Sequence, residues 1–288
     1  MLALIIVMYE MRYDQSNTLN SLNELYIKLT DERKKLLKII IKDNSVVSNN
    51  EYDYRNKINF PFLYINKSEN EGLAESYTYC AKLSKEKYQK DWVVLLDQDT
   101  CLDMKYLNEV IDQIETQGNN EDIVALVPKI KTASYYLSPR HVNIFGLLRP
   151  IDSPGSRIYK KKIMAINSTS VIRLNFLESI GYFNSEFPLD YLDHWFYEKI
   201  YTEGRSVFIL DSVLEHELSL DNMDSVSENR YRSYINSENK FYSNGKTRKE
   251  YLTYKVKLFG RIIKLLLAKR YNFARLNVYL FLKGELHD

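Results

Sequence analysis

Short apolar runs that end in polar turn residues recur along the first half of the chain, and they limit its possible folds more than any other feature. They occupy residues 2–7, 36–41, 62–65, 92–96 and 123–127. Between them, apolar residues at every third or fourth position predict helices over residues 18–29, 73–88 and 105–116. This alternation is typical of an α/β fold with a mainly parallel central sheet, whose ligands bind at the carboxyl ends of the strands.

The second half of the chain carries a weaker form of the same pattern. Residues 132–154 contain Pro, Ser and Arg without periodicity, as expected of a long functional loop. A strand over residues 162–166, a helix near 174–180, a helix over 193–202 capped by Gly204 and a strand over 207–210 follow. The pattern predicts one domain over residues 1–220, which divides into halves at residues 1–117 and 118–220.

Residues 221–288 form a region of different composition, which is helical, rich in Tyr and basic. Between Lys246 and Lys283 the only acidic residue is Glu250. Leu258, Ile262 and Leu265 share one stripe of the expected helix, beside a basic stripe, so the helix is amphipathic. Either this helix packs on the catalytic domain, or it lies on an anionic membrane surface. A homo-oligomer formed by this chain is a further alternative.

Composition excludes several classes of protein. The chain has 40 basic and 38 acidic side chains, a balance that argues against a nucleic-acid-binding protein. Cys80 and Cys101 are too few for a disulfide scaffold or a zinc cluster, which favours a reduced, cytosolic protein. The apolar run at residues 2–8 is too short to span a membrane and lacks preceding basic residues, so it is expected to be the opening strand.

The apolar run at residues 92–96 leads directly into two carboxylates, Asp97 and Asp99. Four interpretations compete for this pair. It is a solvated turn with a helix-capping Asp, a calcium loop, a phosphatase motif, or a nucleotide-sugar site whose metal bridges the diphosphate. The calcium loop fails because Leu102 stands where Gly is required, and the haloacid-dehalogenase phosphatase motif has Thr where this chain has Cys101.

The neighbouring polar segments favour the nucleotide-sugar site. They are Lys42-Asp43-Asn44-Ser45 after the second strand, Asn70-Glu71-Gly72 at a helix start, and Asp97-Gln98-Asp99-Thr100. As an ordered set they resemble the inverting family 2 glycosyltransferases of the GT-A fold, in particular the bacterial rhamnosyltransferase-like branch. In that branch the metal motif typically reads Asp-Gln-Asp-Ser/Thr.

The resemblance extends to about residue 220. Residues 166–170 are similar to the family's Asn-Ser-Gly segment on the acceptor side, and residues 180–187 to its Gly-Gly-Phe-Asp-Glu-x-Phe run. Residues 189–195 resemble the stretch that carries the catalytic base, and residues 214–216 the stretch with a late metal-binding His. Three positions depart from the family pattern, namely Glu10, Thr78 and Thr169, where Asn, Asn and Gly are usual.

The resemblance implies a catalytic domain over residues 1–220, with a nucleotide-sugar-binding half at 1–117 and an acceptor-binding half at 118–220. It also implies a role for each candidate residue. Asp193 is the implied general base, and a Mn²⁺ or Mg²⁺ ion is held by Asp99 with Asp97 and His216. The implied nucleotide-sugar contacts are Tyr9, Asp43, Asn70, Gly72, Asp97, Gln98 and Asp99. The implied acceptor-side residues are Asn167, Ser168, Asp190 and Trp195. Without the resemblance, Asp193 also fits a helix cap, Asp43 a turn, and His216 a structural histidine.

The sequence thus predicts an inverting glycosyltransferase that takes its sugar from a dTDP- or UDP-linked donor, with rhamnose favoured and a hexose possible. The expected acceptor is a lipid-linked molecule or an oligosaccharide of capsule, cell-wall or exopolysaccharide synthesis. The expected location is the cytoplasm, at the inner face of the cell membrane. A metal-dependent phosphatase and a noncatalytic subunit that binds sugar nucleotides are the alternatives.

Overall fold

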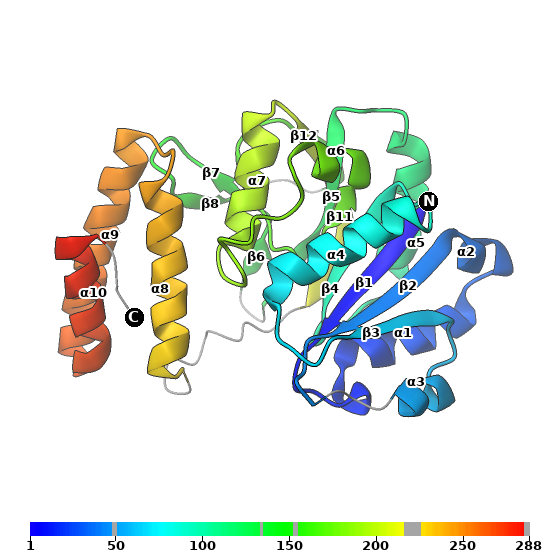
Figure 1. Cartoon of the computed structure of the whole chain (residues 1–288). Helices are drawn as coiled ribbons and strands as arrows, with labels where there is room; N and C mark the ends of the chain where they lie inside the picture. The colour runs from blue at the N-terminus through cyan, green and yellow to red at the C-terminus, as the bar shows by residue number, and fades with distance from the viewer. Residues whose placement is uncertain (48–50, 133–134, 152–154, 216–225, 285–288) are drawn as a thin grey trace. The chain divides into compact units, whose positions relative to one another are not determined.

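A computed structural model describes residues 1–47, 51–132, 135–151, 155–215 and 226–284. These residues form two compact units (Figure 1). The first unit includes the described residues of Met1–Arg140 and Pro150–His216, and the second those of His141–Arg149 and Glu217–Asp288. The boundary predicted at residue 220 lies outside the described residues, as does His216.

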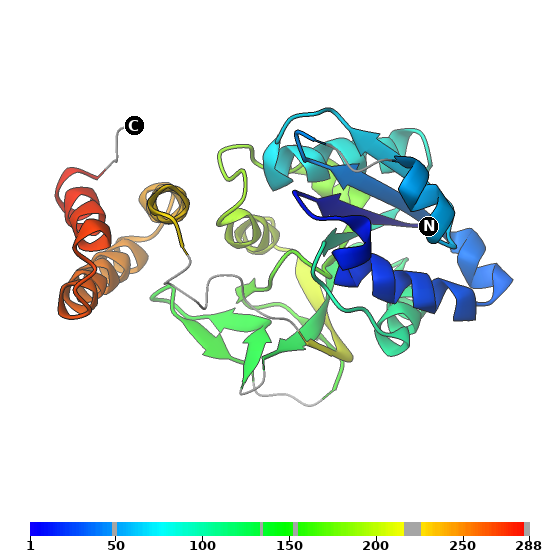
Figure 2. The same cartoon turned by 90° about the horizontal axis from the view of Figure 1, so that it is seen from below.

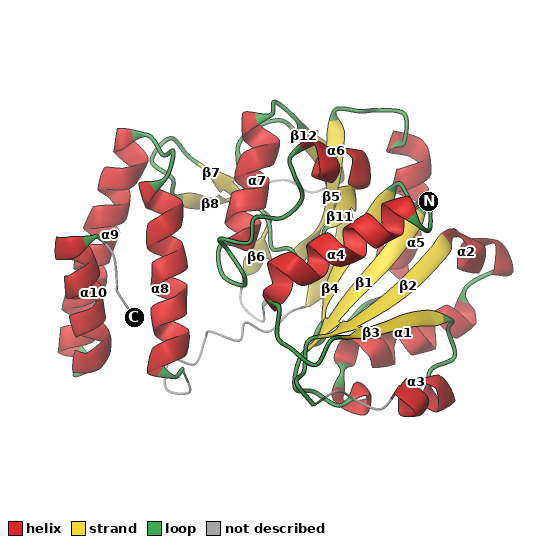
Figure 3. Cartoon of the chain, viewed as in Figure 1, coloured by secondary structure: helices red, strands yellow, loops and turns green. Residues whose placement is uncertain are grey.

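A mixed sheet forms the centre of the first unit, in the order β3-β2-β1-β4-β11-β5-β12-β9, with β6 paired to β5 (Figure 3). The strands are β1 (Leu2–Met8), β2 (Leu37–Asp43), β3 (Phe62–Asn66), β4 (Trp92–Asp97), β5 (Ile123–Lys131), β6 (Tyr136–Ser138), β9 (Arg157–Tyr159), β11 (Val171–Arg173) and β12 (Ser206–Glu215). The first four strands of that order run parallel, and β11 lies antiparallel between β4 and β5. The predicted α/β class with flanking helices is confirmed, and the inserted β11 makes the sheet mixed.

Helices cover both faces of this sheet (Figure 2). They are α1 (Asn17–Lys28), α2 (Asp31–Leu36), α3 (Glu51–Lys57), α4 (Gly72–Glu86), α5 (Met104–Gln117), α6 (Leu174–Ser179) and α7 (Leu192–Thr202), with a short 3-10 turn, η1 (Tyr13–Gln15). Every residue of β1 is buried, which explains its uninterrupted apolar sequence. One side of β1 joins a core cluster with the apolar faces of α1 and α5, and α4 contacts β1 as well.

The observed helices start and end close to the predicted positions, and side-chain caps fix the first residues of two of them. Ser16 caps α1 and Asp103 caps α5, each by accepting a hydrogen bond from a backbone N–H of the first turn. The region at residues 132–154 carries three short strands that its sequence did not predict: β6, β7 (Arg140–Val142) and β8 (Leu148–Pro150). The strand expected at residues 162–166 shortens to β10 (Ile163–Met164).

The second unit contains α8 (Glu228–Ser243), α9 (Arg248–Leu267) and α10 (Tyr271–Lys283). Their core includes Ile235, Leu258 and Leu280, all fully buried. Arg261 of α9 donates to both carboxylate oxygens of Glu238 on α8, at 2.5 and 2.7 Å. Among the described residues, no helix has both the length and the apolar character that crossing a membrane requires.

Candidate active site

The Asp97–Thr100 turn follows β4 at the carboxyl edge of the sheet, and the start of α1 holds its backbone. The Ser16 hydroxyl donates to the Gln98 carbonyl at 2.7 Å. The Thr100 N–H donates to the Thr18 hydroxyl oxygen at 2.9 Å, and that hydroxyl also lies 3.0 Å from the Thr100 carbonyl. These contacts fix the turn, so the carboxylates project from a rigid backbone.

Gln98 ties this turn to the end of β1. Its side-chain carbonyl accepts a hydrogen bond from the Tyr9 N–H at 2.8 Å. The Glu10 carboxylate raises the pKa of the Tyr9 hydroxyl, and the Asn70 side chain lies near the same hydroxyl. Three of the implied nucleotide-sugar residues, Tyr9, Asn70 and Gln98, are therefore brought together at one edge of the sheet.

Asp97 and Asp99 differ in their surroundings. The Asp97 carboxylate is half-buried and accepts a hydrogen bond from the Tyr77 hydroxyl at 2.8 Å. Burial raises the pKa of Tyr77, and the charge of Asp97 raises it further, so Tyr77 stays a neutral donor. Asp99 is exposed, and among the described residues its carboxylate has no hydrogen-bond or ion-pair partner. Asp99 is thus the carboxylate with both oxygens accessible to an added ligand.

Two hard oxygen donors at one turn suit Mg²⁺ or Mn²⁺, so the residues present are compatible with the predicted metal. Among the residues that the structure describes, no three His, Cys, Asp or Glu side chains are placed so that together they could hold a metal ion. The third predicted ligand, His216, lies outside those residues. The metal set of Asp97, Asp99 and His216 therefore stays a prediction.

The segment at residues 167–170 joins the carboxylate turn to the second half of the site. Ser168 lies between the two: the Asp97 N–H donates to its hydroxyl at 3.2 Å, and the Thr100 hydroxyl lies 2.7 Å from it. Thr169 holds a left-handed backbone conformation with φ of 69°, at the position where Gly is usual. The Asn167 side-chain oxygen is buried and has no hydrogen-bond partner among the described residues, so it can accept one from a ligand.

Asp193 lies in the first turn of α7, where it accepts a hydrogen bond from the His194 N–H at 2.7 Å. One turn later, the Tyr197 hydroxyl lies 2.6 Å from the Ser170 hydroxyl. Burial raises the pKa of Tyr197, and the charge of Asp193, four residues earlier on the same helix, raises it further. Residues 167–170 therefore contact the carboxylate turn through Ser168 and the helix that carries Asp193 through Ser170.

The other predicted acceptor-side residues, Asp190 and Trp195, flank Asp193 and are half-buried. Tyr191, between Asp190 and Asp193, starts α7 from a left-handed conformation with φ of 63°. Its ring stacks on His194 with 4.6 Å between centroids. The turn before α7 thus sets the direction in which the helix begins.

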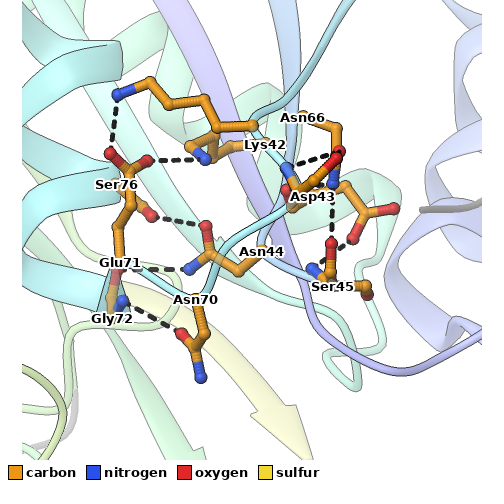
Figure 4. A network of polar contacts seen from close by, with 11 residues as sticks. Lys42, Asp43, Asn44, Ser45, Asn66, Asn70, Glu71, Gly72 and Ser76 are labelled. Atoms are coloured by element: carbon orange, nitrogen blue, oxygen red, sulfur yellow. Dashed lines mark hydrogen bonds and ion pairs between the residues drawn. The ribbon is translucent and has the colours of Figure 1, made fainter. Parts of the chain in front are cut away.

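Asp43 ends β2 and is fully buried in a network of polar contacts (Figure 4). Its carboxylate oxygens accept hydrogen bonds from the Ser45 N–H at 2.9 Å and the Tyr64 hydroxyl at 2.8 Å. Asn66 donates to the backbone carbonyls of Asp43 and Ser45, both at 2.9 Å. Because these contacts fix the end of β2, they account for Asp43 structurally, and its contact with a nucleotide base stays a prediction.

Gly72 opens α4 against the carbonyl of Pro188. A Cβ at Gly72 would lie 2.8 Å from the Pro188 oxygen, and the residue has φ of +76°. The N–H groups of Leu73 and Ala74 donate to the same oxygen at 2.7 and 3.3 Å. Asn70 accepts from the Gly72 N–H at 3.0 Å. These amides therefore bind Pro188, a contact between α4 and the segment before Asp190.

A buried ion pair beside this network was not found from the sequence. Lys42 of β2 is fully buried, and its ammonium lies 2.8 Å from a Glu71 carboxylate oxygen, although the angles do not meet those of a hydrogen bond (Figure 4). Lys67 contacts the other Glu71 oxygen at 2.6 Å. In the sequence, a lysine at the end of an apolar strand indicates that Lys42 needs an acidic partner, but only tertiary packing decides that this partner is Glu71.

Comparisons with known proteins agree with this architecture. The profile of Glycosyl transferase family 2 matches residues 5–181, more than half of the chain. The chain belongs to glycosyltransferase family 2. A search of curated proteins gives no match.

Solved structures show the same GT-A fold at low sequence identity. TarS of S. aureus has a TM-score of 0.54 and 15% identity, covering 96% of this chain and 55% of TarS. The mannosyltransferase PcManGT of Pyrobaculum calidifontis, in complex with GDP-Man and Mn²⁺, has a TM-score of 0.57 and 10% identity, covering 99% and 88%. GalNAc-T7 with UDP, GalNAc and Mn²⁺ has a TM-score of 0.58 and 16% identity, covering 84% and 49%. The chain spans about half the length of TarS.

Proposed function

We propose that the protein is a nucleotide-sugar-dependent, inverting glycosyltransferase. One observation carries the proposal: residues 167–170 contact the carboxylate turn through Ser168 and Thr100, and they contact α7, the helix that begins with Asp193 in its first turn, through Ser170 and Tyr197. Inversion requires a base on one face of the anomeric carbon and a leaving diphosphate on the other. A pair of separate carboxylates connected by one rigid segment meets that requirement.

Asp193 is the proposed general base. Its carboxylate removes the proton of the acceptor hydroxyl as the hydroxyl oxygen bonds to the anomeric carbon and the bond to the nucleoside diphosphate breaks. Asp190 and Trp195 on the same segment, and Asn167 and Ser168 opposite, are the proposed acceptor contacts. The unpaired Asn167 oxygen supports this, because it suits a sugar hydroxyl.

Asp99, Asp97 and His216 are the proposed ligands of Mn²⁺ or Mg²⁺. Such an ion, when bound, neutralises negative charge on the leaving diphosphate. Tyr77 holds Asp97 in place, and Gln98 holds the turn against Tyr9. The proposed donor is dTDP- or UDP-linked, with rhamnose or a hexose as the sugar, and Asp43, Asn70 and Gly72 line its nucleoside side.

The experiment is a donor panel. Purified protein is incubated with dTDP-rhamnose, UDP-hexoses and GDP-mannose, with Mn²⁺ or Mg²⁺ and with lipid-linked or oligosaccharide acceptors, and released nucleotide and extended product are measured. Asp99→Asn and Asp193→Asn should each lower transfer at least a hundredfold. The matched control is Asp103→Asn, which keeps a capping side chain on α5. Release of inorganic phosphate without a sugar donor would refute the proposal.

We also propose that α9 lies on an anionic membrane at the inner face of the cell membrane, where a lipid-linked acceptor of polysaccharide synthesis would be found. Besides its buried stripe, α9 has a second apolar face whose side chains are 43–72% exposed. It comprises Leu252, Val256, Phe259, Ile263 and Leu266. Exposed Lys249, Lys257 and Lys264 lie on the same helix, and Glu250 is buried in a capping box. Cations without exposed acids match anionic lipid and would repel the same face of a second copy.

Flotation with vesicles tests this surface. The protein should bind phosphatidylglycerol vesicles and not phosphatidylcholine vesicles, and Phe259→Glu should abolish binding. Ile27→Glu, at an exposed apolar residue of α1, is the matched control and should bind normally. If the protein instead dimerises without lipid and Phe259→Glu disrupts the dimer, the exposed apolar face of α9 is the interface of a homo-oligomer.

A further inference from the structure

A cavity of about 360 Å³ in the first unit lies apart from the carboxylate turn and has no role in the proposed reaction so far. β5, β6, β9 and β12 contribute to its walls. Three of its lining residues are cations: Lys129 of β5, Arg140 after β6, and Arg157 of β9. The lining also includes Tyr136, Pro150 and Ile209. Three cations around one small cavity are costly unless an anion neutralises them.

Two hydrogen-bond donors of the arginines that line this cavity have no acceptor among the described residues. The Nε atoms of Arg140 and Arg157 are both buried from solvent, and neither has a hydrogen-bond partner among the described residues. The rest of Arg140 is held by a hydrogen bond from its guanidinium to the Tyr136 carbonyl at 3.0 Å. The Arg157 guanidinium lies over the Tyr159 ring, 5.4 Å from its centroid. Both guanidinium groups are therefore positioned, while each keeps a buried N–H donor without an acceptor.

The charge of the cavity defines the kind of ligand that fits. Lys129 forms an ion pair with Asp211 at 3.0 Å, so one positive charge is already neutralised. The charges of Arg140 and Arg157 remain, which matches a ligand with two negative charges. The planar donor fork of arginine matches the oxygens of phosphate. A phosphate monoester or a diphosphate has the required charge and several acceptor oxygens.

The register of the sheet locates the cavity relative to the carboxylate turn. Val171 of β11 pairs with Val94 of β4 on one side and with Leu126 of β5 on the other. Asp97 and Lys129 each come three residues later on their parallel strands. Because two strand spacings separate β4 from β5, these strands are roughly 10 Å apart. The cavity therefore lies at the same edge of the sheet as the proposed donor site, on the acceptor half of the chain.

We propose that this cavity is a second anion site, which binds a phosphate or diphosphate group other than that of the donor sugar nucleotide. Its ligand is either a phosphate carried by the acceptor or a free phosphate-class anion. The acceptor source rests on the proposed glycosyl transfer, whereas the anion site itself does not. Arg140 and Arg157 bind the anion, and Lys129, which is paired with Asp211, lines the same cavity.

Calorimetric titration of the full-length protein with inorganic pyrophosphate tests the site, in buffer with EDTA so that no divalent ion supports binding at Asp97 and Asp99. The wild type should bind pyrophosphate, and the double variant Arg140→Gln, Arg157→Gln should lose at least tenfold in affinity. Arg157→Lys keeps the charge but loses the donor fork, so its affinity should fall between the two. Arg205→Gln is the matched control, because Arg205 pairs with Asp122 at the other end of β12 and should leave affinity unchanged.

Two further measurements separate this inference from the proposed function and identify the source of the anion. The affinity for UDP in the presence of Mn²⁺ should be the same in the wild type and the double variant. This result is expected even if none of the tested donors supports sugar transfer. Farnesyl diphosphate that binds at least tenfold more tightly than pyrophosphate would assign the site to a lipid-linked acceptor, and equal affinity to a free anion. No binding of pyrophosphate by the wild type, equal affinity in the folded double variant, or loss of EDTA-resistant binding in Asp99→Asn would overturn the second site.

Discussion

The contact between Gly72 and Pro188 gives a prediction whose size can be worked out from the structure. Gly72→Ala has two costs. The residue has φ of +76°, where a side chain costs about 1–2 kcal/mol. Its Cβ would also lie 2.8 Å from the Pro188 oxygen, which forces a backbone shift worth about 1–3 kcal/mol. The expected loss of unfolding free energy is therefore about 2–5 kcal/mol.

Gly204→Ala is the matched control. Gly204 has φ of +65°, and a Cβ there would meet nothing within 4 Å. It has only the conformational cost, about 1–2 kcal/mol. The difference between the two variants, about 1–3 kcal/mol, isolates the clash with Pro188.

Urea unfolding followed by tryptophan fluorescence suits this comparison, because Trp92 and Trp195 are the only tryptophans and both lie in the first unit. Since Pro188 precedes Asp190 and Asp193, its displacement should also lower kcat/KM for transfer by roughly tenfold in Gly72→Ala. Gly204→Ala should keep wild-type kcat/KM. Equal destabilisation of the two variants, or full activity of folded Gly72→Ala, would refute the argument that Pro188 links α4 to the catalytic segment.

Three other predictions follow from individual contacts. Tyr77→Phe removes the hydrogen-bond donor to Asp97, so it should lower the unfolding free energy by about 1 kcal/mol and raise the Mn²⁺ concentration for half-maximal activity several-fold. The control Tyr106→Phe, which loses a hydrogen bond to the Thr169 carbonyl, should lower the unfolding free energy alone. Burial raises the pKa of Glu71, but hydrogen bonds and charge from Lys42 and Lys67 outweigh burial and hold the pKa below its ordinary value of 4.5. The ionised Glu71 carboxylate therefore stabilises the fold fully above pH 4.5, and this stabilisation is lost as the pH falls through the lowered pKa. Glu71→Gln should remove that acid dependence in urea unfolding at pH 3 to 6, and an unchanged pH profile would contradict the assignment. Glu238→Gln removes the ion-pair partner of Arg261 in the second unit, so it should lower the unfolding free energy, followed by circular dichroism, by about 3 kcal/mol. Glu215→Gln, which removes an exposed ion pair with Lys131, should lower it by less than about 1 kcal/mol.

Much of the fold follows from local sequence. The runs that became β1 and β4 are apolar because those strands are buried, and that pattern is visible without tertiary information. The runs of β2 and β3 were also found from their apolar residues, although β2 contains Lys38 and β3 is mostly half-buried. Helices α1, α4 and α5 follow from spacing. β11 was missed because three residues are too few for a periodic signal, and its antiparallel place between β4 and β5 depends on pairing with distant strands.

The candidate site divides in the same way. By itself the sequence determined the family resemblance, the carboxylates Asp97 and Asp99 after a buried strand, and Asp193 at a helix start, because those are local patterns. Only the tertiary structure decided that Tyr77 occupies Asp97 while Asp99 stays accessible. Pro188 against Gly72 and the cavity around Arg140 and Arg157 were also decided there. The physical reason is that hydrogen bonds, ion pairs and steric contacts act between residues that are near in space, and separation along the chain does not reveal which residues those are.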